Sequence, residues 1–236
     1  MRFLSLIPSP EALPNSSLSF MVGAAADELA TETHWVVDAA GALDEDRLRS
    51  VMKDAARADE PILLLGTALA LLRAVERLEE VPADPLPTGS RIMETGGFKG
   101  LDRSIGREEL YDRVTKATGV LRDSIVSEYG MTELLSQLYE PVLSEGPHAA
   151  GAYVAPPWLK VRALDPVTLD EVEPGEPGLL AFFDLANAGS VCHVLTEDVG
   201  AVVEGRVSLQ GRVQGAEPRG CSRAMDELMS SAGSAS

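Results

Sequence analysis

The amino-acid sequence predicts an α/β fold, in which a mostly parallel sheet flanked by helices is followed by a smaller β-rich subdomain. Two observations support this prediction. Between Trp35 and Leu138, short apolar runs alternate with stretches of helical periodicity, which is typical of parallel strands joined by crossover helices. After Tyr139, frequent prolines exclude long helices, while apolar runs of strand length recur.

The predicted elements of the first half alternate in type along the chain. They are a helix over 43–58, a strand over 61–65, a helix over 68–80, a strand over 90–94, a helix over 106–118, a strand over 123–127 and the opening of a helix over 132–138. Asp44 is a favoured N-cap residue for the first helix. In the third element, apolar residues recur at helical spacing, which predicts one buried face. That face consists of Leu69, Leu72, Val75 and Leu78.

The second half is predicted to be a β-rich subdomain. Apolar runs over 159–164 and 179–183 are predicted to pair as strands, because the segment between them is rich in turn-forming residues. The prolines and glycines around 146–151 indicate a soft boundary. We therefore expect an α/β portion over 1–146, a β-rich subdomain over 147–228 and a flexible tail of small residues over 229–236.

Length and charge exclude several classes of protein. A chain of 236 residues can bury a sizeable core without disulfide support. Its formal net charge of −17, from 20 basic and 37 acidic residues, argues against an extended nucleic-acid or anionic-membrane surface. The longest apolar run is shorter than the ~20 residues that cross a bilayer, and prolines interrupt the apolar N-terminus. We expect a cytoplasmic protein with neither a membrane span nor a secretory signal.

One loop combines groups that suit a bound nucleotide. In Tyr129-Gly130-Met131-Thr132-Glu133, the aromatic ring can cover a base and the glycine lets backbone approach a ligand. The threonine can donate to a phosphate oxygen, and the glutamate can hold Mg²⁺. A strand followed by a tight turn and a helix N-terminus is also an anion-binding geometry. The alternative is an ordinary helix N-cap formed by Thr132 and Glu133.

Three further patterns contain candidate ligand-binding residues, each with a structural alternative. Gly96 and Gly97 follow a predicted strand and permit close backbone approach, or form only a flexible connection. Asp198, in Thr196-Glu197-Asp198, offers a carboxylate, or belongs to a solvated turn. Arg212 suits bidentate contact with an anion, or forms a surface ion pair.

The two cysteines differ in their surroundings. Cys221 lies between Arg219 and Arg223, and nearby positive charge favours the nucleophilic thiolate, although an isolated cysteine is more often a packing residue. Cys192 lies in an apolar run and is predicted to be part of the core. The three histidines have no metal-ligand spacing.

Taken together, these motifs resemble those of the adenylate-forming ligases, and most closely the acyl-protein synthetase family of the bacterial luciferase systems (LuxE-like). The resemblance runs from residues 2–10 through 94–100 to 219–222. It implies an adenylate-forming ligase fold that is truncated at its N-terminus relative to the family, and activation of a carboxylic acid, usually a long-chain fatty acid, by ATP and Mg²⁺. It also implies a partner acyl-reductase subunit and allows a homo-oligomer.

The resemblance assigns roles residue by residue. Residues 129–132 and the glycines 96 and 97 border the nucleotide, Asp198 and Arg212 hold the ribose, and Glu133 binds the metal. Thr132 and Glu133 take part in adenylation, after which the thiol of Cys221 accepts the acyl group. The sequence departs from the family's Thr-Gly-Asp motif at Glu197, which replaces the glycine.

The superfamily also uses a Ser/Thr/Gly-rich phosphate loop followed by a lysine, and nothing before Glu94 contains such a run. Loss of that loop would remove electrostatic stabilisation of the transition state. We therefore expect this chain alone to be weak or inactive in adenylation. Two alternatives stay open at this point: a non-catalytic module that binds a nucleotide or an acyl-adenylate, and an inactive fragment.

Overall fold

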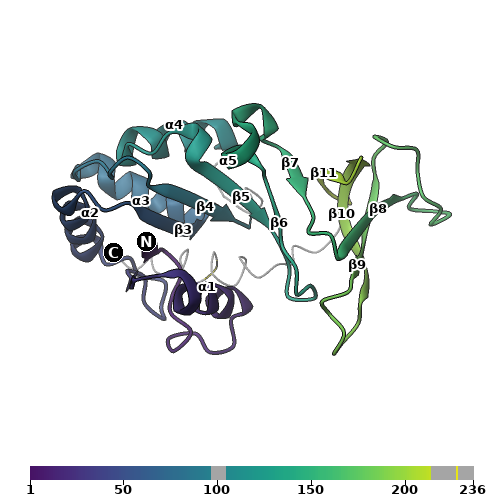
Figure 1. Ribbon diagram of the computed structural model, residues 1–236, viewed down its shortest axis with the longest axis horizontal. Helices are drawn as coiled ribbons and strands as arrows, with labels where there is room; N and C mark the ends of the chain where they lie inside the picture. Colours follow the sequence, from purple (N-terminus) through teal and green to yellow (C-terminus); the bar gives the residue numbers. More distant parts are fainter. Residues whose placement is uncertain (97–104, 214–226, 228–236) are drawn as a thin grey trace. The chain divides into compact units, whose positions relative to one another are not determined.

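The computed structural model describes residues 1–96, 105–213 and 227, which divide into two compact units (Figure 1). The division falls between Ser127 and Glu128. It differs from the boundary expected near 146–151, because the short strands on either side of that segment pair with each other through Tyr139 and Val154. Both sides of the expected boundary therefore belong to the second unit.

The first unit alternates strands and helices, as predicted. It contains β1 (Arg2–Ser5), α1 (Ser17–Leu29), β2 (Glu32–Trp35), α2 (Glu45–Ala58), β3 (Ile62–Thr67), α3 (Ala68–Glu80), β4 (Arg91–Thr95), α4 (Arg107–Thr118), the 3-10 turn η1 (Arg122–Ser124) and the first part of β5 (Ile125–Tyr129). The strand order is β2-β1-β3-β4-β5, and the pairs β1/β2, β1/β3 and β3/β4 are parallel. These findings confirm the predicted parallel sheet.

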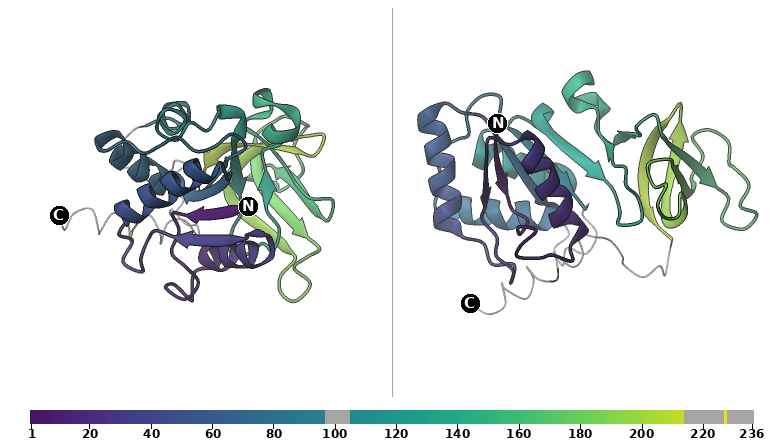
Figure 2. Two further views of the ribbon diagram at one scale, coloured as in Figure 1. Left: turned by 60° about the vertical axis from the view of Figure 1, so that its left-hand side comes forward. Right: turned by 60° about the horizontal axis from the view of Figure 1, so that its bottom comes forward.

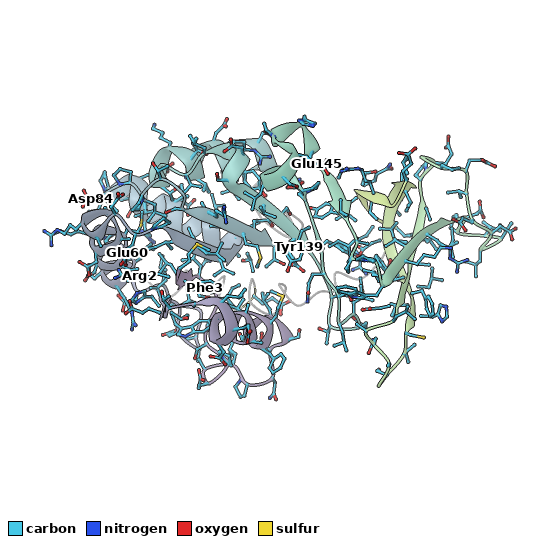
Figure 3. The ribbon with its side chains drawn as sticks, viewed as in Figure 1. Arg2, Phe3, Glu60, Asp84, Tyr139 and Glu145 are labelled. Atoms are coloured by element: carbon cyan, nitrogen blue, oxygen red, sulfur yellow. The ribbon has the colours of Figure 1, made fainter. Side chains whose placement is uncertain are left out.

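Helices cover both faces of this sheet. Figures 1 and 2 show α1 on one side of the strands, with α3 and α4 on the other. Neighbouring residues of a strand point to opposite faces, so Phe3 packs with Ala26 of α1, whereas Leu4 joins a larger cluster that includes Leu71 and Val114. At the start of β1, a guanidinium nitrogen of Arg2 lies 2.8 Å from a carboxylate oxygen of Glu60 (Figure 3).

Local signals place the predicted helices well. The side chain of Asp44 accepts a hydrogen bond from the backbone of Arg47, which confirms it as the N-cap of α2. Helix α3 has the predicted bounds, and its apolar face is buried except at Leu69, which is only partly buried. Helix α4 ends at Gly119, whose φ of 78° lies in the left-handed region that glycine adopts easily.

The second unit is built from antiparallel strands. It contains β6 (Leu138–Tyr139), the short helix α5 (Val142–Glu145), the 3-10 turn η2 (Pro147–Ala149), β7 (Ala152–Val154), β8 (Leu159–Leu164), β9 (Gly178–Asp184), β10 (His193–Val203) and β11 (Arg206–Arg212). The strand order is β6-β7-β11-β10-β9-β8, and β6 also pairs with the last two residues of β5. The pairing of β8 with β9 confirms the predicted strand pair.

A tight hairpin joins β10 to β11. Val203 pairs with Arg206, so the loop consists of Glu204 and Gly205, with φ angles of 48° and 78°. Positive φ at both loop positions is the pattern of a two-residue type I′ turn, which matches the twist of antiparallel strands. Across the part of the chain that the structure describes, every helix is too short or too polar to cross a bilayer.

Candidate functional site

Three of the predicted site residues meet within the second unit. The Tyr129 hydroxyl donates a hydrogen bond to Oδ2 of Asp198 at 2.7 Å. Nε of Arg212 lies 3.1 Å from Oδ1 of the same carboxylate. Strands β5, β10 and β11 each contribute one of these residues. Tyr129 of the predicted nucleotide loop and Arg212 therefore both contact the carboxylate of Asp198. We call Tyr129, Asp198 and Arg212 the carboxylate cluster.

The backbone of β10 explains how Asp198 reaches this position. Asp198 is directly opposite Arg212 in the β10–β11 pair, and the register shifts between Val199 and Gly200, which marks a β-bulge. The Thr196 hydroxyl accepts a hydrogen bond from the backbone N–H of Asp198 and donates one to the carbonyl of Leu180. The predicted Thr-Glu-Asp motif is therefore an irregular strand segment, anchored to β9.

The Tyr129 ring is packed among other aromatic rings. It stacks on Phe182 with ring centroids 5.8 Å apart, and it meets Tyr153 in an edge arrangement with ring centroids 6.3 Å apart. Burial and the Asp198 carboxylate raise the pKa of Tyr129 well above its usual value, so the phenol stays protonated and donates to that carboxylate. Phe182 covers one face of this ring.

Asp198 and Arg212 remain accessible to a ligand. Their side chains are 20% and 18% exposed. A carboxylate has several lone pairs, so Asp198 can accept a ribose hydroxyl in addition to its bond from Tyr129. Arg212 also lies 3.0 Å from a carboxylate oxygen of Glu197, which gives it a second carboxylate neighbour.

The segment after Tyr129 is a turn, and the predicted helix over 132–138 is wrong. Met131 is half-buried against the core of the second unit, and Thr132 and Glu133 are exposed in the turn. Gly130 approaches Glu128 closely, since an added Cβ would lie 2.5 Å from Oε1 of that residue. The chain then extends into β6 rather than coiling.

Two residues that were absent from the sequence predictions shape this turn. Asp184, at the end of β9, accepts hydrogen bonds from the backbone N–H groups of Leu135 and Ser136, each at 3.0 Å. Asn187 donates from its side-chain amide to the carbonyl of Glu133 at 2.8 Å. The backbone N–H groups of Leu135 and Ser136 are therefore already bound to a carboxylate of the protein. One signal could have identified Asp184: an acidic residue that ends an alternating strand on its buried side.

The first unit contains the start of the predicted glycine loop. Gly96 has a φ of 85°, a left-handed conformation that glycine permits at little cost. Just before it, Glu94 is fully buried and accepts hydrogen bonds from the Tyr111 hydroxyl at 3.0 Å and the Ser127 hydroxyl at 2.8 Å. Burial, with a smaller effect of Glu94, raises the pKa of Tyr111 well above its usual value. Gly97 lies outside the described residues.

One of the two cysteines differs from its prediction, and the other lies outside the described residues. Cys221 lies outside the described residues, so its predicted role as acyl acceptor stays a prediction. Cys192 is half-buried, with its Sγ 3.7 Å from Nδ1 of His193. The prediction that Cys192 belongs to the core is wrong, because the residues around it form an irregular segment between β9 and β10 rather than a buried strand.

A metal would find few fixed ligands in the described ranges 1–96, 105–213 and 227. No group of three or more histidine, cysteine, aspartate or glutamate residues in these ranges could hold a metal ion. Mg²⁺ is commonly bound by one or two carboxylates together with substrate phosphates. The exposed Glu133 side chain fits that pattern, in which the metal arrives with a nucleotide.

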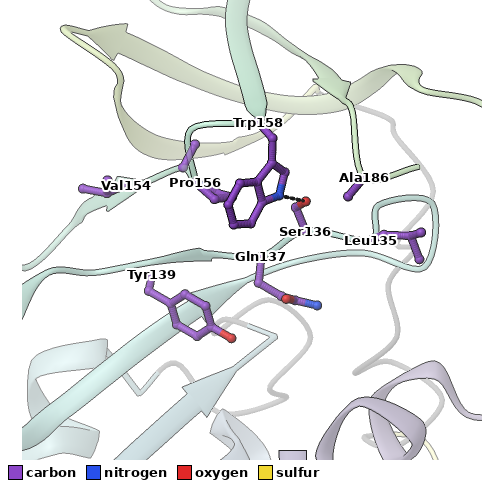
Figure 4. A pocket seen from close by; sticks show the side chains of 9 residues that line it. Leu135, Ser136, Gln137, Tyr139, Val154, Pro156, Trp158 and Ala186 are labelled. Atoms are coloured by element: carbon purple, nitrogen blue, oxygen red, sulfur yellow. Dashed lines mark hydrogen bonds between the residues drawn. The ribbon is translucent and has the colours of Figure 1, made fainter. Parts of the chain in front are cut away.

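A pocket of about 460 Å³ lies beside the turn, entirely within the second unit (Figure 4). Its lining is mostly apolar and consists of Leu135, Ser136, Gln137, Tyr139, Val154, Ala155, Pro156, Trp158 and Ala186. The indole N–H of Trp158 donates to the Ser136 hydroxyl at 3.0 Å. The pocket wall and the turn after the nucleotide motif are therefore connected through Ser136.

Comparison with known families gives a match over almost the whole chain. Residues 10–230 match the family described as acyl-protein synthetase, LuxE. One relative is the long-chain-fatty-acid–luciferin-component ligase of Vibrio harveyi, which is 29% identical over 146 residues. That alignment covers 58% of this chain and 36% of the ligase. The aligned region is therefore little more than a third of that ligase.

Solved structures with the same fold are adenylate-forming enzymes. ATP-bound MatB from Rhodopseudomonas palustris is similar with a TM-score of 0.58 and 18% identity, covering 89% of this chain and 40% of that one. The amide bond synthetase McbA from Marinactinospora thermotolerans has a TM-score of 0.60 and 15% identity, covering 90% and 41%. At such identities the likeness shows the fold alone, and it confirms the predicted adenylate-forming ligase fold.

Proposed function

This chain belongs to the acyl-protein synthetase (LuxE) family, and from that premise we propose that it takes part in ATP-dependent activation of a carboxylic acid, followed by transfer of the acyl group to a cysteine thiol. The chain covers 36% of the Vibrio harveyi ligase. Because the alignment spans little more than a third of that ligase, the full activity is a proposal for this chain.

The carboxylate cluster is the observation that carries this proposal. Asp198 is partly exposed, is oriented by Tyr129 and Arg212, and lies on the same unit as the Thr132–Glu133 turn. A carboxylate held in this way suits the two hydroxyl groups of a ribose, and the neighbouring guanidinium suits an anionic ligand. The proposed nucleotide is ATP, with its base against Tyr129 and its phosphates near Thr132.

The proposed reaction has two steps. First, an oxygen of the acid attacks the α-phosphorus of ATP, and the bond to pyrophosphate breaks to give acyl-AMP. Next, a cysteine thiolate attacks the acyl carbonyl carbon, and AMP leaves with the electrons of the cleaved C–O bond. Cys221 is the proposed thiol, and Glu133 is the proposed carboxylate toward Mg²⁺.

The acid and the partners follow from the family. The relative from Vibrio harveyi is named as a long-chain-fatty-acid ligase, so we propose a fatty acid as the substrate class. We also propose an acyl-reductase subunit as the next acceptor and the cytoplasm as the location. The strongly acidic composition, with 37 acidic residues against 20 basic ones, agrees with a small-molecule or protein partner rather than nucleic acid.

Calorimetry with AMP tests the nucleotide site. We expect AMP binding by the wild-type chain to weaken at least about tenfold in Asp198→Ala, because a charge-assisted hydrogen bond contributes about 1.5–3 kcal/mol. Asp170→Ala is the matched control, since Asp170 is an exposed aspartate in the same unit. Equal AMP affinities for the wild type and Asp198→Ala would refute the ribose role.

Acyl labelling tests the thiol. Incubation of the intact gene product with radioactive fatty acid, ATP and Mg²⁺ should label the wild-type protein and the Cys192→Ser control, but not Cys221→Ser. Labelling that persists in Cys221→Ser would refute the thioester. Acid-dependent pyrophosphate exchange should be lost in Glu133→Gln, and AMP binding without any exchange in the wild type would favour a non-catalytic nucleotide-binding module.

A further inference from the structure

The backbone that follows the nucleotide motif is fixed by a fully buried carboxyl group. Asp184 is 0% exposed and accepts hydrogen bonds from the N–H groups of Leu135 and Ser136 at 3.0 Å. It also accepts from the Ser136 hydroxyl at 2.8 Å and from the N–H of Ala186 at 3.0 Å. Three backbone groups and one hydroxyl therefore share one carboxylate, which ties two chain segments together.

A second buried side chain holds the turn from the other end. The amide nitrogen of Asn187 donates to the carbonyl of Glu133 at 2.8 Å and to the carbonyl of Val191 at 3.0 Å. Asn187 is only 6% exposed, so few water molecules compete for these bonds. Glu133 is thus attached through its own backbone, while its side chain stays in solvent.

The hydrogen bonds continue to the pocket. Ser136 donates to Asp184 and accepts from the indole of Trp158, as Figure 4 shows for the latter bond. The carbonyl of Trp158 in turn accepts from the backbone of Leu185, next to Asp184. These bonds connect Asp184, Ser136, Trp158 and Leu185 in a closed ring beside the turn. The fluorescence of Trp158 can therefore report on that ring.

We propose that Asp184 and Asn187 are positioning residues, which fix the backbone of residues 133–136 so that the Glu133 carboxylate is presented in one place to a nucleotide-bound Mg²⁺. The contrast in exposure supports this role, because the backbone is anchored in the interior while the side chain of Glu133 is exposed. A turn fixed in advance loses less conformational entropy on binding. The part that concerns Mg²⁺ rests on the proposed function.

The anchoring is tested first, without any ligand. Hydrogen exchange of the Leu135 and Ser136 amides should be at least about fivefold faster in Asn187→Ala, since a lost hydrogen bond of about 1 kcal/mol corresponds to that factor. The control is Ser190→Ala, an exposed position in the same segment. In a Trp35→Phe background, the emission of Trp158 should shift to longer wavelength in Asn187→Ala. Unchanged exchange at both amides would overturn the proposal.

The effect on the metal is tested by binding. Calorimetry with ATP and Mg²⁺ should give about a tenfold higher Kd for Asn187→Ala than for the wild type, with AMP binding in the absence of Mg²⁺ changed less than twofold. In a Glu133→Gln background, Asn187→Ala should add nothing, because both changes act through one carboxylate. Additive losses would overturn the positioning role.

Failure of the two proposals can be told apart. If Glu133→Gln binds ATP and Mg²⁺ like the wild type, the metal role in the proposed function is refuted, while the exchange experiment still decides the anchoring. If Asn187→Ala does not fold, Ser136→Ala replaces it, because that change removes one hydroxyl between Asp184 and Trp158. The same amide exchange and Trp158 emission then support or overturn the anchoring.

Discussion

Glu94 in the first unit and Asp184 in the second are both fully buried acidic residues beside a predicted nucleotide motif, yet they bind different kinds of donor. Glu94 accepts from the side-chain hydroxyls of Tyr111 and Ser127. Asp184 accepts mainly from backbone N–H groups. The first arrangement depends on which side chains stand opposite, whereas the second depends on the path of the chain.

This difference determines how strongly the neighbouring backbone depends on each carboxyl group. A hydroxyl donor can be removed by one substitution, and the backbone of β4 and β5 can keep its ladder of hydrogen bonds. Backbone donors stay in place when Asp184 is replaced, so loss of Asp184 leaves several buried N–H groups without their acceptor, and such groups are costly. We therefore expect the turn after the nucleotide motif to depend on Asp184 more strongly than the Gly96 loop depends on Glu94.

Replacing each residue by alanine tests this expectation most directly. We expect Asp184→Ala to lower the free energy of unfolding by about 3–4 kcal/mol and Glu94→Ala by about 2–3 kcal/mol, on the scale of one to three kcal/mol for each unsatisfied buried group. Urea unfolding followed by circular dichroism measures both values. A larger loss in Glu94→Ala would reverse the comparison.

The dependence of stability on alkaline pH tests Tyr111 and Tyr129, each of which donates a hydrogen bond to a carboxyl group in its own unit. Burial raises the pKa of both Tyr111 and Tyr129 in the folded protein. Above about pH 10 the unfolded tyrosines lose their protons while the folded ones keep them, so stability falls as pH rises, by about 1.4 kcal/mol per pH unit for each tyrosine. Urea midpoints between pH 8 and pH 11 should fall less in Tyr111→Phe and in Tyr129→Phe than in the wild type. Equal slopes in all three proteins would contradict the assignment.

Removing one hydroxyl donor to Glu94 or to Asp184 should give the smallest change in the free energy of unfolding. Ser127→Ala and Ser136→Ala each delete a donor to the buried carboxyl group, at an expected cost of about 1 kcal/mol. Only Ser136→Ala should also change the emission of Trp158, because only Ser136 accepts from that indole. Chemical unfolding and tryptophan fluorescence provide the two measurements, and an emission change in Ser127→Ala would show that the surroundings of Glu94 and Asp184 are not independent.

Much of the first unit could be predicted from local signals. The caps and apolar periodicity of α2, α3 and α4 are encoded in adjacent residues, as the Asp44 cap shows. Helix α1 was missed, since its apolar residues are interleaved with alanine and glycine and give a weak pattern. Strands β10 and β11 were also missed, because the bulge near Gly200 breaks the alternation by which a strand is recognised.

The candidate site was predicted only in part. The resemblance predicted Asp198 and Arg212 as site residues, and the structure brings the Asp198 carboxylate to both the Tyr129 hydroxyl and Arg212. The helix over 132–138 was predicted from Thr132-Glu133-Leu134-Leu135-Ser136-Gln137-Leu138, a run that is compatible with a helix by composition. The decisive contacts come from Asp184 and Asn187, which lie 48 to 54 residues farther along the chain. No local pattern around residue 133 carries that information.

The hairpin between β10 and β11 sets a constraint on chain length rather than on residue type. The pairing of Asp198 with Arg212 follows from the number of residues between each of them and the two-residue turn at Glu204 and Gly205. β11 has one extra residue, Gln210, opposite Val199 and Gly200. A single insertion or deletion between them would slide one strand past the other and turn one member of the pair to the opposite face. Engineering of this hairpin should therefore conserve the spacing of 198 to 212.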